Sequence, residues 1–195
     1  LDVVTNDFGT VTVTNAADVT LVDANAIVLD GVPLAILITG NLQVTTAGPL
    51  TVSAAINAGG SVTMTNNSGF LTIEAGASVT AIDGFTQDGD GLVSLGANVT
   101  SVGNDISFLS GVTLTVNVVL QSSLAGDITF LSTVDGGKTL TLNAGSGKTE
   151  FHGNVGATPA VPPGLGLGDG SADAITISGG DVDFGVGSEI EVYLN

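Results

Sequence analysis

Pairs of carboxylates two residues apart are the side chains of this sequence whose types and spacing best fit chemistry. Asp181 and Asp183 form one pair, and Glu189 and Glu191 form another. Residues two apart on a β-strand project from the same face, so stacked strands would bring all four carboxylates onto one surface. Such a surface fits a glycosidase pair, a ladder of Ca²⁺ ligands or a solvated outer face. We expect the solvated face, because charged residues most often lie in water.

A second candidate for metal binding is the segment DGDG at residues 88–91. Its alternation of Asp and Gly resembles part of a calcium loop, and Ca²⁺ takes oxygen ligands from carboxylates and turn carbonyls. The segment lacks the later Glu of an EF-hand loop and does not recur every nine residues, as it would in a calcium-binding β-roll. Asp88 and Asp90 are therefore the predicted metal ligands, with Ca²⁺ as the one candidate ion and no other cofactor expected.

The small set of basic residues disfavours an enzyme. Lys138, Lys148 and His152 are the only ones, and Arg is absent. A lyase acting on an acidic polymer needs a basic residue to abstract a proton, and a nucleophilic triad needs a base that a third group orients. His152 lies close to Glu150 in the sequence, but we expect these two side chains to point to opposite faces of a strand and His152 to sit at a surface or turn edge. We predict that the chain has no catalytic activity.

These residues are embedded in a four-residue phrase that recurs along most of the chain: an apolar residue, Thr, an apolar residue and a variable one. It occurs at residues 11–14, 19–22, 50–53, 62–65, 71–74, 112–115, 128–131, 140–143 and 175–178. Alternation at period two predicts a short β-strand with one buried face, and Thr suits the other, half-wet face. Gly, Asn and Asp between the phrases predict turns. Self-similarity of this kind indicates a repeat architecture.

The spacing of the strands selects the type of repeat. Strand centres near Val44, Val52, Met64, Ile73 and Thr80 follow one another at steps of about 8, 12, 9 and 7 residues, so two steps average about 20. The connections are too short for crossover helices, and the strands are too short for a β-sandwich. We therefore predict an all-β parallel β-helix, or β-solenoid, with about 20 residues per coil and negligible helix content. Nine or ten coils would give a rod about 45 Å long.

Composition and charge narrow the core and the partners. Hydrophobic residues make up 43% of the chain and aromatic residues 4%, which predicts a thin aliphatic core. The 19 acidic residues against two Lys give a formal net charge of -17, which repels nucleic-acid phosphates and anionic headgroups. No apolar run approaches the roughly 20 residues of a membrane span, and the absence of Cys excludes disulfides and thiolate sites. We expect neither nucleic-acid binding nor membrane insertion.

Irregular segments suggest an organisation in three parts. Residues 1–158 are predicted to form solenoid repeats, with a turn-rich insertion between coils at residues 83–91. Residues 159–174, rich in Pro and Gly, are predicted to be an insertion or linker. Residues 175–195 contain too few strands for a core of their own, so we expect them to continue or cap the solenoid. Because the chain opens in repeat pattern at Leu1, we expect a processed product or a piece of a larger protein.

Several segments together resemble a known family. They are residues 6–27 and 40–48, GNDISF at 103–108, GDITF at 126–130, DGGKTLTLNAGSG at 135–147 and FHGNVGATP at 151–159. Over roughly residues 1–159 the chain is similar to the repeats of filamentous-haemagglutinin-like bacterial surface proteins, and after Pro159 it departs from their rhythm. The resemblance implies an exported, right-handed parallel β-helix that acts in adhesion, biofilms or surface fibres.

The function predicted from these features is that of a non-enzymatic structural or adhesive module of an extracellular or cell-surface fibre. Both ends of the sequence, residues 1–4 and 191–195, are in strand pattern without an evident polar cap, which favours end-to-end self-association. The other expected partner is a glycan or protein receptor on a host or other surface. The alternatives left open are a carbohydrate-binding surface, for which Thr in register would supply a flat array, and a polysaccharide-degrading β-helix using Asp181 or Asp183.

Overall fold

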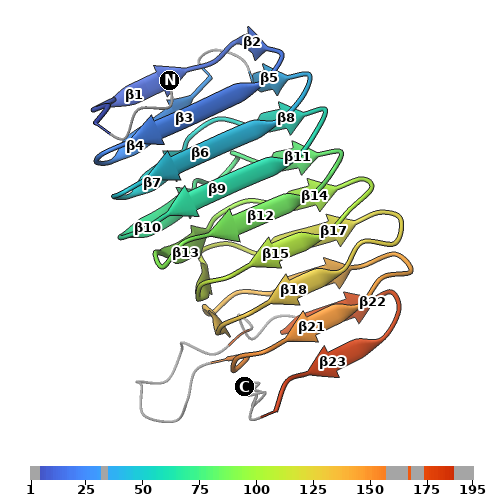
Figure 1. Ribbon diagram of the computed structural model, residues 1–195. Coiled ribbons are helices and arrows are strands. Elements are labelled where there is room, and N and C mark those ends of the chain that lie inside the picture. The colour runs from blue at the N-terminus through green and yellow to red at the C-terminus, as the bar shows by residue number, and fades with distance from the viewer. Residues whose placement is uncertain (1–4, 32–34, 157–166, 168–173, 187–195) are drawn as a thin grey trace.

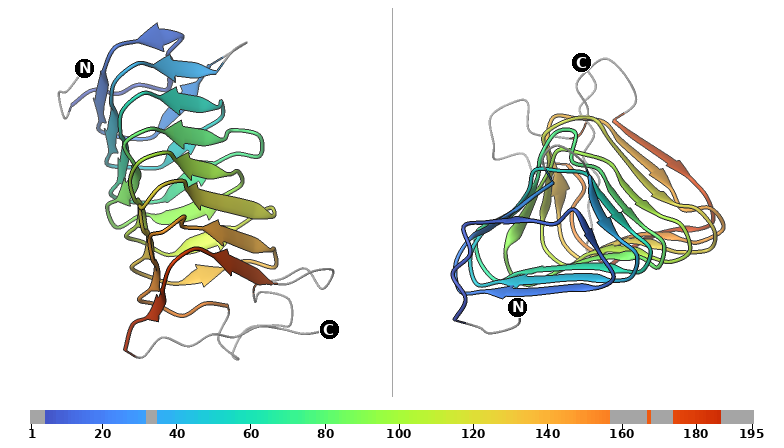
Figure 2. Two further views of the ribbon diagram at one scale, coloured as in Figure 1. Left: turned by 90° about the vertical axis from the view of Figure 1, so that its right-hand side faces the viewer. Right: turned by 90° about the horizontal axis from the view of Figure 1, so that it is seen from above.

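The recurring phrases form short β-strands that wind into a solenoid. In the computed structural model, which describes residues 5–31, 35–156, 167 and 174–186, every regular element is a β-strand. The strands pair in parallel in three sheets, and the coils outline a triangle when seen from above (Figures 1 and 2). Viewed from the N-terminal end, the chain runs clockwise as it recedes, so the solenoid is right-handed (Figure 2). The predicted all-β, right-handed parallel β-helix is confirmed.

Over the described residues, sheets B and C take one strand from every coil, and sheet A takes one from every coil but the last. Sheet A contains β1 (Thr10–Thr12), β4 (Ile27–Asp30), β7 (Leu50–Val52), β10 (Phe70–Ile73), β13 (Leu92–Leu95), β16 (Val112–Leu114) and β19 (Val134–Asp135). Sheet B contains β2 (Asn15–Ala16), β5 (Ile36–Ile38), β8 (Ile56–Ala58), β11 (Val79–Ala81), β14 (Val99–Ser101), β17 (Val118–Ser122), β20 (Leu140–Asn143) and β22 (Ile175–Ser178). Sheet C contains β3 (Val19–Asp23), β6 (Leu42–Thr46), β9 (Val62–Asn66), β12 (Phe85–Asp88), β15 (Ile106–Phe108), β18 (Ile128–Phe130), β21 (Thr149–Phe151) and β23 (Val182–Phe184).

The length of a coil follows from the pairing register. Partners on neighbouring strands are mostly 18 to 23 residues apart, from Thr10 with Val28 to Val19 with Leu42, which confirms the expected value of about 20. The last step is 33 to 35 residues, because residues between β21 and β22 lengthen that coil. Over the described residues the sheets have seven or eight strands, so the expectation of nine or ten coils is wrong.

Each coil has three strands, whereas the spacing of the phrases had suggested two. Several of the strands without a phrase are in sheet B, although β11, β20 and β22 of that sheet had been predicted. In β8 the sequence is Ile56-Asn57-Ala58, which buries Ile56 and Ala58 but has no Thr and only three residues. A three-residue strand between turn residues leaves too short an alternation to stand out from a loop.

The core lies inside the triangle and is built by alternation. Inward residues of nearly every strand are buried, as in β6, where Leu42, Val44 and Thr46 are buried and the residues between them are not. The expectation of a purely aliphatic core is wrong. Four buried phenylalanines, at positions 85, 108, 130 and 151, lie one above the next, and the exposed Phe184 continues the column, with ring centroids 5.3 to 5.5 Å apart. A short aromatic column needs few residues, so the 4% aromatic content did not reveal it.

The sequence had suggested that residues 83–91 form an insertion between coils. This prediction is wrong. Phe85 and Gln87 are fully buried in β12, which pairs with β9 and β15. The Gln87 amide nitrogen donates to Asn66 Oδ1 at 3.1 Å, and its oxygen accepts the backbone N–H groups of Leu109 and Ser110 at 3.1 and 3.0 Å. The polar Gln87 at a core position interrupts the alternation of apolar and polar residues, so the strand was not recognised. Its hydrogen bonds compensate for the burial of its amide.

The strands expected after residue 175 extend the same sheets. β22 pairs with β20 in sheet B, and β23 pairs with β21 in sheet C. Most of the predicted insertion at residues 159–174 lies outside the described residues, but Leu167 and Ala174 are described and are buried in the core. Residues 1–4, Glu189, Glu191 and the rest of residues 187–195 also lie outside the described part of the chain.

Candidate functional site

The outward side chains form straight columns along the rod. Residues in register on successive strands are about 4.8 Å apart, so each sheet presents one side chain per step. Sheet C presents Thr20, Gln43, Thr63, Thr86, Ser107, Thr129, Glu150 and Asp183. Sheet A presents Val28, Thr51, Thr72, Ser94, Thr113 and Asp135. Sheet B presents Asn15, Leu37, Asn57, Thr80, Thr100, Gln121, Asn143 and Ser178. The Thr in register expected for a contact surface is present, and in sheet B amides join it.

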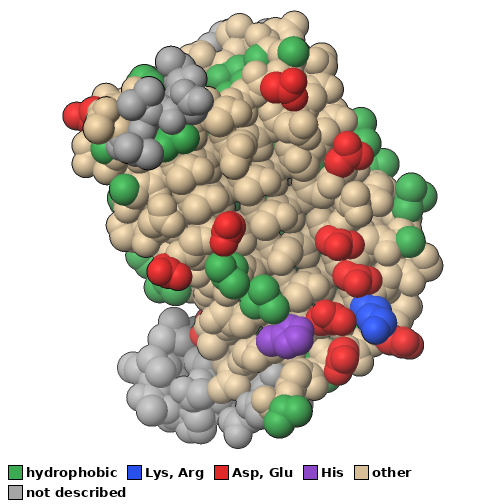
Figure 3. Space-filling view, viewed as in Figure 1, with side chains coloured by type: hydrophobic (Ala, Val, Ile, Leu, Met, Phe, Trp, Pro, Cys, Tyr) green, Lys and Arg blue, Asp and Glu red, His purple; other side chains and the backbone are tan. Residues whose placement is uncertain are grey.

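A column of Asp and Asn follows the corner between sheets B and C. Asp18 Oδ1 accepts the backbone N–H of Asn41 at 2.7 Å, and Asp105 Oδ1 accepts that of Asp127 at 2.8 Å. Asp127 Oδ1 in turn accepts the N–H of Lys148 at 2.6 Å. Acidic side chains also gather along one edge of the face in Figure 3. At this corner the carboxylates bond backbone amides of the next coil, which gives part of the acidic excess a structural role.

Two ionisable side chains lie close together at sheet C, near the C-terminal end of the described residues. His152 Nε2 lies 3.6 Å from Glu150 Oε2, with the two side chains 46% and 26% exposed. The expectation that they face opposite sides is wrong, because residues two apart on a strand share a face. The expected surface position of His152 is confirmed.

In the first predicted carboxylate pair, Asp181 and Asp183, the register of sheet C gives Asp183 a different acidic neighbour. Asp183 is exposed in β23 and pairs with Glu150 of β21, so these two acids are neighbours on the outer face. Asp181 is exposed just before β23, and its carbonyl accepts the Thr149 N–H at 2.9 Å. Glu150 was not predicted as the neighbour of Asp183, because only the pairing register between strands reveals it. The second pair, Glu189 and Glu191, falls outside the described residues.

Asp88 and Asp90, the predicted Ca²⁺ ligands, are both exposed at the end of β12. Asp88 Oδ1 accepts the N–H of Gly89 at 2.7 Å, and Gly89 adopts a φ of 90°. The two acids thus form a turn in which one carboxylate is already bonded to backbone. Among the described residues no group of three or more His, Cys, Asp or Glu is placed to hold a metal ion, and Ca²⁺ binding here stays a prediction.

Asp135 ends the outward column of sheet A in a partly buried position. Within the described part of the chain its Oδ1 atom is buried without a hydrogen-bond partner. Burial raises the pKa of Asp135 above its usual value of 3.8, because the charged form is the one that loses hydration.

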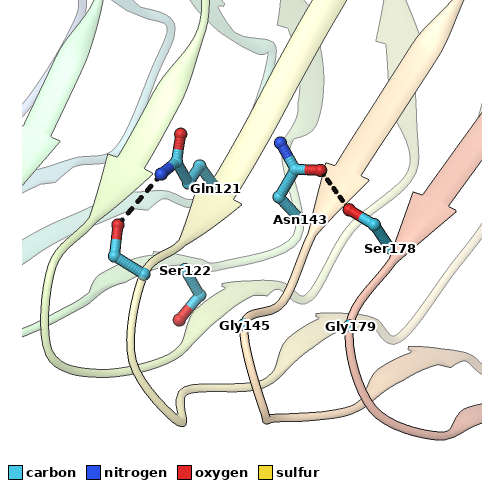
Figure 4. A pocket seen from close by; sticks show the side chains of 7 residues that line it. Gln121, Ser122, Asn143, Gly145, Ser178 and Gly179 are labelled. Atoms are coloured by element: carbon cyan, nitrogen blue, oxygen red, sulfur yellow. Dashed lines mark hydrogen bonds between the residues drawn. The ribbon is translucent and has the colours of Figure 1, made fainter.

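Two hollows lie on the outer face of sheet B, and the sequence had not indicated either. One, of about 300 Å³, spans β17, β20 and β22 and is lined by Gln121, Ser122, Ser123, Asn143, Gly145, Ser178 and Gly179 (Figure 4). The other, of about 530 Å³, lies over β5, β8 and β11 and is lined by Asn15, Leu37, Ile38, Thr39, Asn57, Ala58, Gly59, Thr80 and Ile82. An amide residue between two apolar ones, as in Ile56-Asn57-Ala58, is the sequence pattern that could have predicted a polar outer face here.

Hydrogen bonds hold the side chains of the smaller hollow side by side. Gln121 Nε2 donates to Ser123 Oγ at 3.1 Å, and the Ser178 hydroxyl donates to Asn143 Oδ1. Figure 4 shows the amides of Gln121 and Asn143 on neighbouring strands, with the turns through Gly145 and Gly179 below them. At Gly145, where φ is 59°, a Cβ would come within 2.4 Å of the Leu124 carbonyl oxygen, so the turn has no room for a side chain.

Comparisons of the chain with protein-family models, curated proteins and solved structures found no match. In the described residues no helix is long and apolar enough to cross a membrane.

Proposed function

We propose that this chain is a non-enzymatic structural and adhesive module of an extracellular or cell-surface fibre. The observation that carries the proposal is the set of in-register outer columns, which run the length of the rod and consist mainly of Thr, Ser, Asn and Gln. Such columns offer many similar hydrogen-bonding groups along a line, which suits contact with an extended partner or surface. The resemblance to filamentous-haemagglutinin-like repeats favours the same role and an exported location.

The formal charge of -17 supports this choice of partners. It disfavours nucleic acids and anionic headgroups, and it limits lateral aggregation of a β-rich surface. A glycan or protein receptor, or another copy of the chain, is the partner that remains.

Adhesion is tested by coating microspheres with the purified chain and measuring their retention under flow on cell and polysaccharide surfaces. Spheres coated with an unrelated globular protein of similar negative charge are the control. We expect greater retention with the chain, because its neutral hydrogen-bonding groups are ordered along a rod. Equal retention of the two kinds of sphere would contradict an adhesive role.

End-to-end assembly is the second part of the proposal. Parallel strands at the end of a solenoid expose backbone N–H and C=O groups unless another element pairs with them. Light scattering at rising protein concentration, with and without Ca²⁺, checks it, together with electron micrographs of the native material. We expect growth in length at constant width. A chain that stays monomeric throughout would remove self-assembly and leave adhesion to be judged separately.

Polysaccharide degradation is the second candidate, favoured by the neighbouring acids Glu150 and Asp183 with His152 beside them. Paired carboxylates are the machinery of most glycosidases. This candidate predicts the release of reducing ends from a polysaccharide and its loss in Glu150→Gln and Asp183→Asn. If no polymer is cleaved, the candidate is removed.

A further inference from the structure

The outer face of sheet B differs from the other two in its charge. Every residue in its outward column and in the lining of its two hollows is uncharged, within the part of the chain that the structure describes. Sheet C carries Asp88, Glu150 and Asp183 on its outer face, and the outward column of sheet A ends in Asp135. In a chain with 19 acidic residues, a face without charge selects for a partner that is itself neutral.

The smaller hollow has hydrogen-bonding groups to spare. Gln121 uses its amide nitrogen on Ser123, which leaves Oε1 as an acceptor. Asn143 uses Oδ1 to accept from Ser178, which leaves two N–H donors on Nδ2. Neither group bonds another described residue. The two amides are in register on β17 and β20, strands about 4.8 Å apart, so an acceptor and a pair of donors lie on neighbouring strands.

The larger hollow adds apolar contact to the same face. Leu37 and Ile82 are 45% and 47% exposed there, beside the amide of Asn57 and the hydroxyl of Thr80. A sugar ring presents hydroxyl groups at its edge and C–H groups on its face, so polar and apolar side chains together suit it.

The two hollows lie on one straight column. Asn57, Thr80, Thr100, Gln121 and Asn143 are consecutive in register, so four strand steps, or about 19 Å, separate the amides at its ends. The nearest lining residues of the two hollows, Thr80 and Gln121, are two steps or about 10 Å apart. A chain of several units laid along the rod can therefore contact both hollows over their full length.

We propose that the outer face of sheet B binds a neutral glycan chain lengthwise, with the amides of Gln121 and Asn143 at one hollow and Leu37, Asn57 and Ile82 at the other. This inference rests on the proposed adhesive function and names the ligand class and the face that serve it. Sugar hydroxyls both donate and accept, which matches the free acceptor and donors of the two amides. Anionic polymers are disfavoured by the net charge of the chain.

The test is calorimetric titration of the whole chain with neutral β-glucan and N-acetylglucosamine oligomers of increasing length, and with oligogalacturonate as the anionic counterpart. The site variant is the double substitution Gln121→Ala and Asn143→Ala. Its matched control is Gln43→Ala and Thr63→Ala, which removes an amide and a hydroxyl from adjacent coils of sheet C. Circular dichroism and thermal melting establish that both variants fold.

We expect at least one neutral series to bind with an affinity that rises with oligomer length, and oligogalacturonate to bind more weakly. The site variant should lose about tenfold in affinity, as expected from a few lost hydrogen bonds, while the sheet C control keeps the affinity of the parent chain. Single substitutions Gln121→Ala and Asn143→Ala replace the double variant if it does not fold.

Three results would overturn the inference: no binding of any neutral oligomer, equal binding of the anionic one, or equal loss in the site variant and the control. If oligomers do not bind but coated spheres are still retained under flow, the glycan face is wrong and the adhesive role stands. If oligomers bind as expected and the spheres are not retained, the site stands and the adhesive role fails.

Discussion

Thr149 shows most directly how a single residue departs from the repeat. It occupies an inward position of sheet C, in register with Ile128 on one side and Val182 on the other. Its side chain is 1% exposed and Oγ1 has no hydrogen-bond partner in the described structure. A hydroxyl buried without a partner costs stability, because its hydrogen bond with water is not replaced.

Thr149→Val is therefore expected to stabilise the chain by about 1 kcal/mol, since Val keeps the shape and removes the unbonded hydroxyl. Urea denaturation followed by circular dichroism measures the change. Thr129→Val, on the outward column of β18 in the previous coil, is the control and should change stability by less than about 0.5 kcal/mol. Destabilisation by Thr149→Val would show that the hydroxyl has a partner in solution.

Asp135 makes stability depend on pH in a predictable direction. Its pKa in the folded chain is raised by burial, so folding favours the protonated carboxyl. The favourable contribution is complete below the usual value of 3.8 and is lost as pH rises through the raised folded value.

Asp135→Asn keeps the shape of the side chain and removes this titration. The melting temperature of the parent chain should fall relative to that of Asp135→Asn as pH is raised from about 3 to neutrality. Comparing the two proteins at each pH cancels the repulsion among the other acids. A difference that does not change with pH would show that Asp135 is hydrated in solution.

At the scale of elements, the phenylalanine column links the later coils. Phe130 is 1% exposed and stacks between Phe108 and Phe151, with ring centroids 5.5 and 5.3 Å away. Parallel pairing at a fixed register places each ring over the next, so each ring inside the column packs against the rings of two neighbouring strands.

Phe130→Ala is expected to cost about 3 to 5 kcal/mol, because it leaves a cavity in the interior of the stack. Phe70→Ala is the control, since Phe70 is 47% exposed on sheet A and should cost far less. Thermal and urea denaturation of both variants provide the measurement. Similar losses in the two would mean that the column is not a continuous unit.

At the scale of the whole molecule, the solenoid behaves as a stack of nearly equivalent coils, each contacting only its neighbours. Val99 and Leu120 are register partners 21 residues apart, so the chain between them makes one turn of the helix. The next coil repeats part of the sequence and its backbone pairing: the Leu131 N–H bonds to the Phe108 carbonyl at 2.9 Å, as the Leu109 N–H bonds to the Gln87 carbonyl at 3.2 Å.

Deletion of residues 99–119 is expected to give a folded protein shorter by one strand step, about 4.8 Å. Small-angle scattering gives the length, and a cooperative melt shows that folding is kept. Deletion of residues 99–108, which is half a coil, is the control. It should abolish cooperative unfolding, because strand residues of one coil would then lie opposite corner residues of the next and could not pair. If both deletions behave alike, the coils are not interchangeable units.

Much of the architecture could be predicted from the sequence because alternation is a local property. In β9, Val62 and Met64 face inward and Thr63 faces outward whatever the rest of the chain does. The coil length followed from the spacing of such phrases, and the parallel stacking followed from connections too short for other folds. Strand β12 was missed because Gln87 broke the pattern, although its hydrogen bonds with other coils make it a core residue.

The candidate surfaces were decided by the tertiary structure. Glu150 came beside Asp183, 33 residues away, and Gln121 beside Asn143, 22 residues away, through the pairing register between coils. That register depends on how many residues each corner takes up, and local periodicity carries no information about it. The sequence by itself therefore determined the strands that carry the phrase, their inward faces and the type of repeat. Only the stacked coils decided which outward residues meet, because neighbours on the surface of a solenoid come from different turns of the chain.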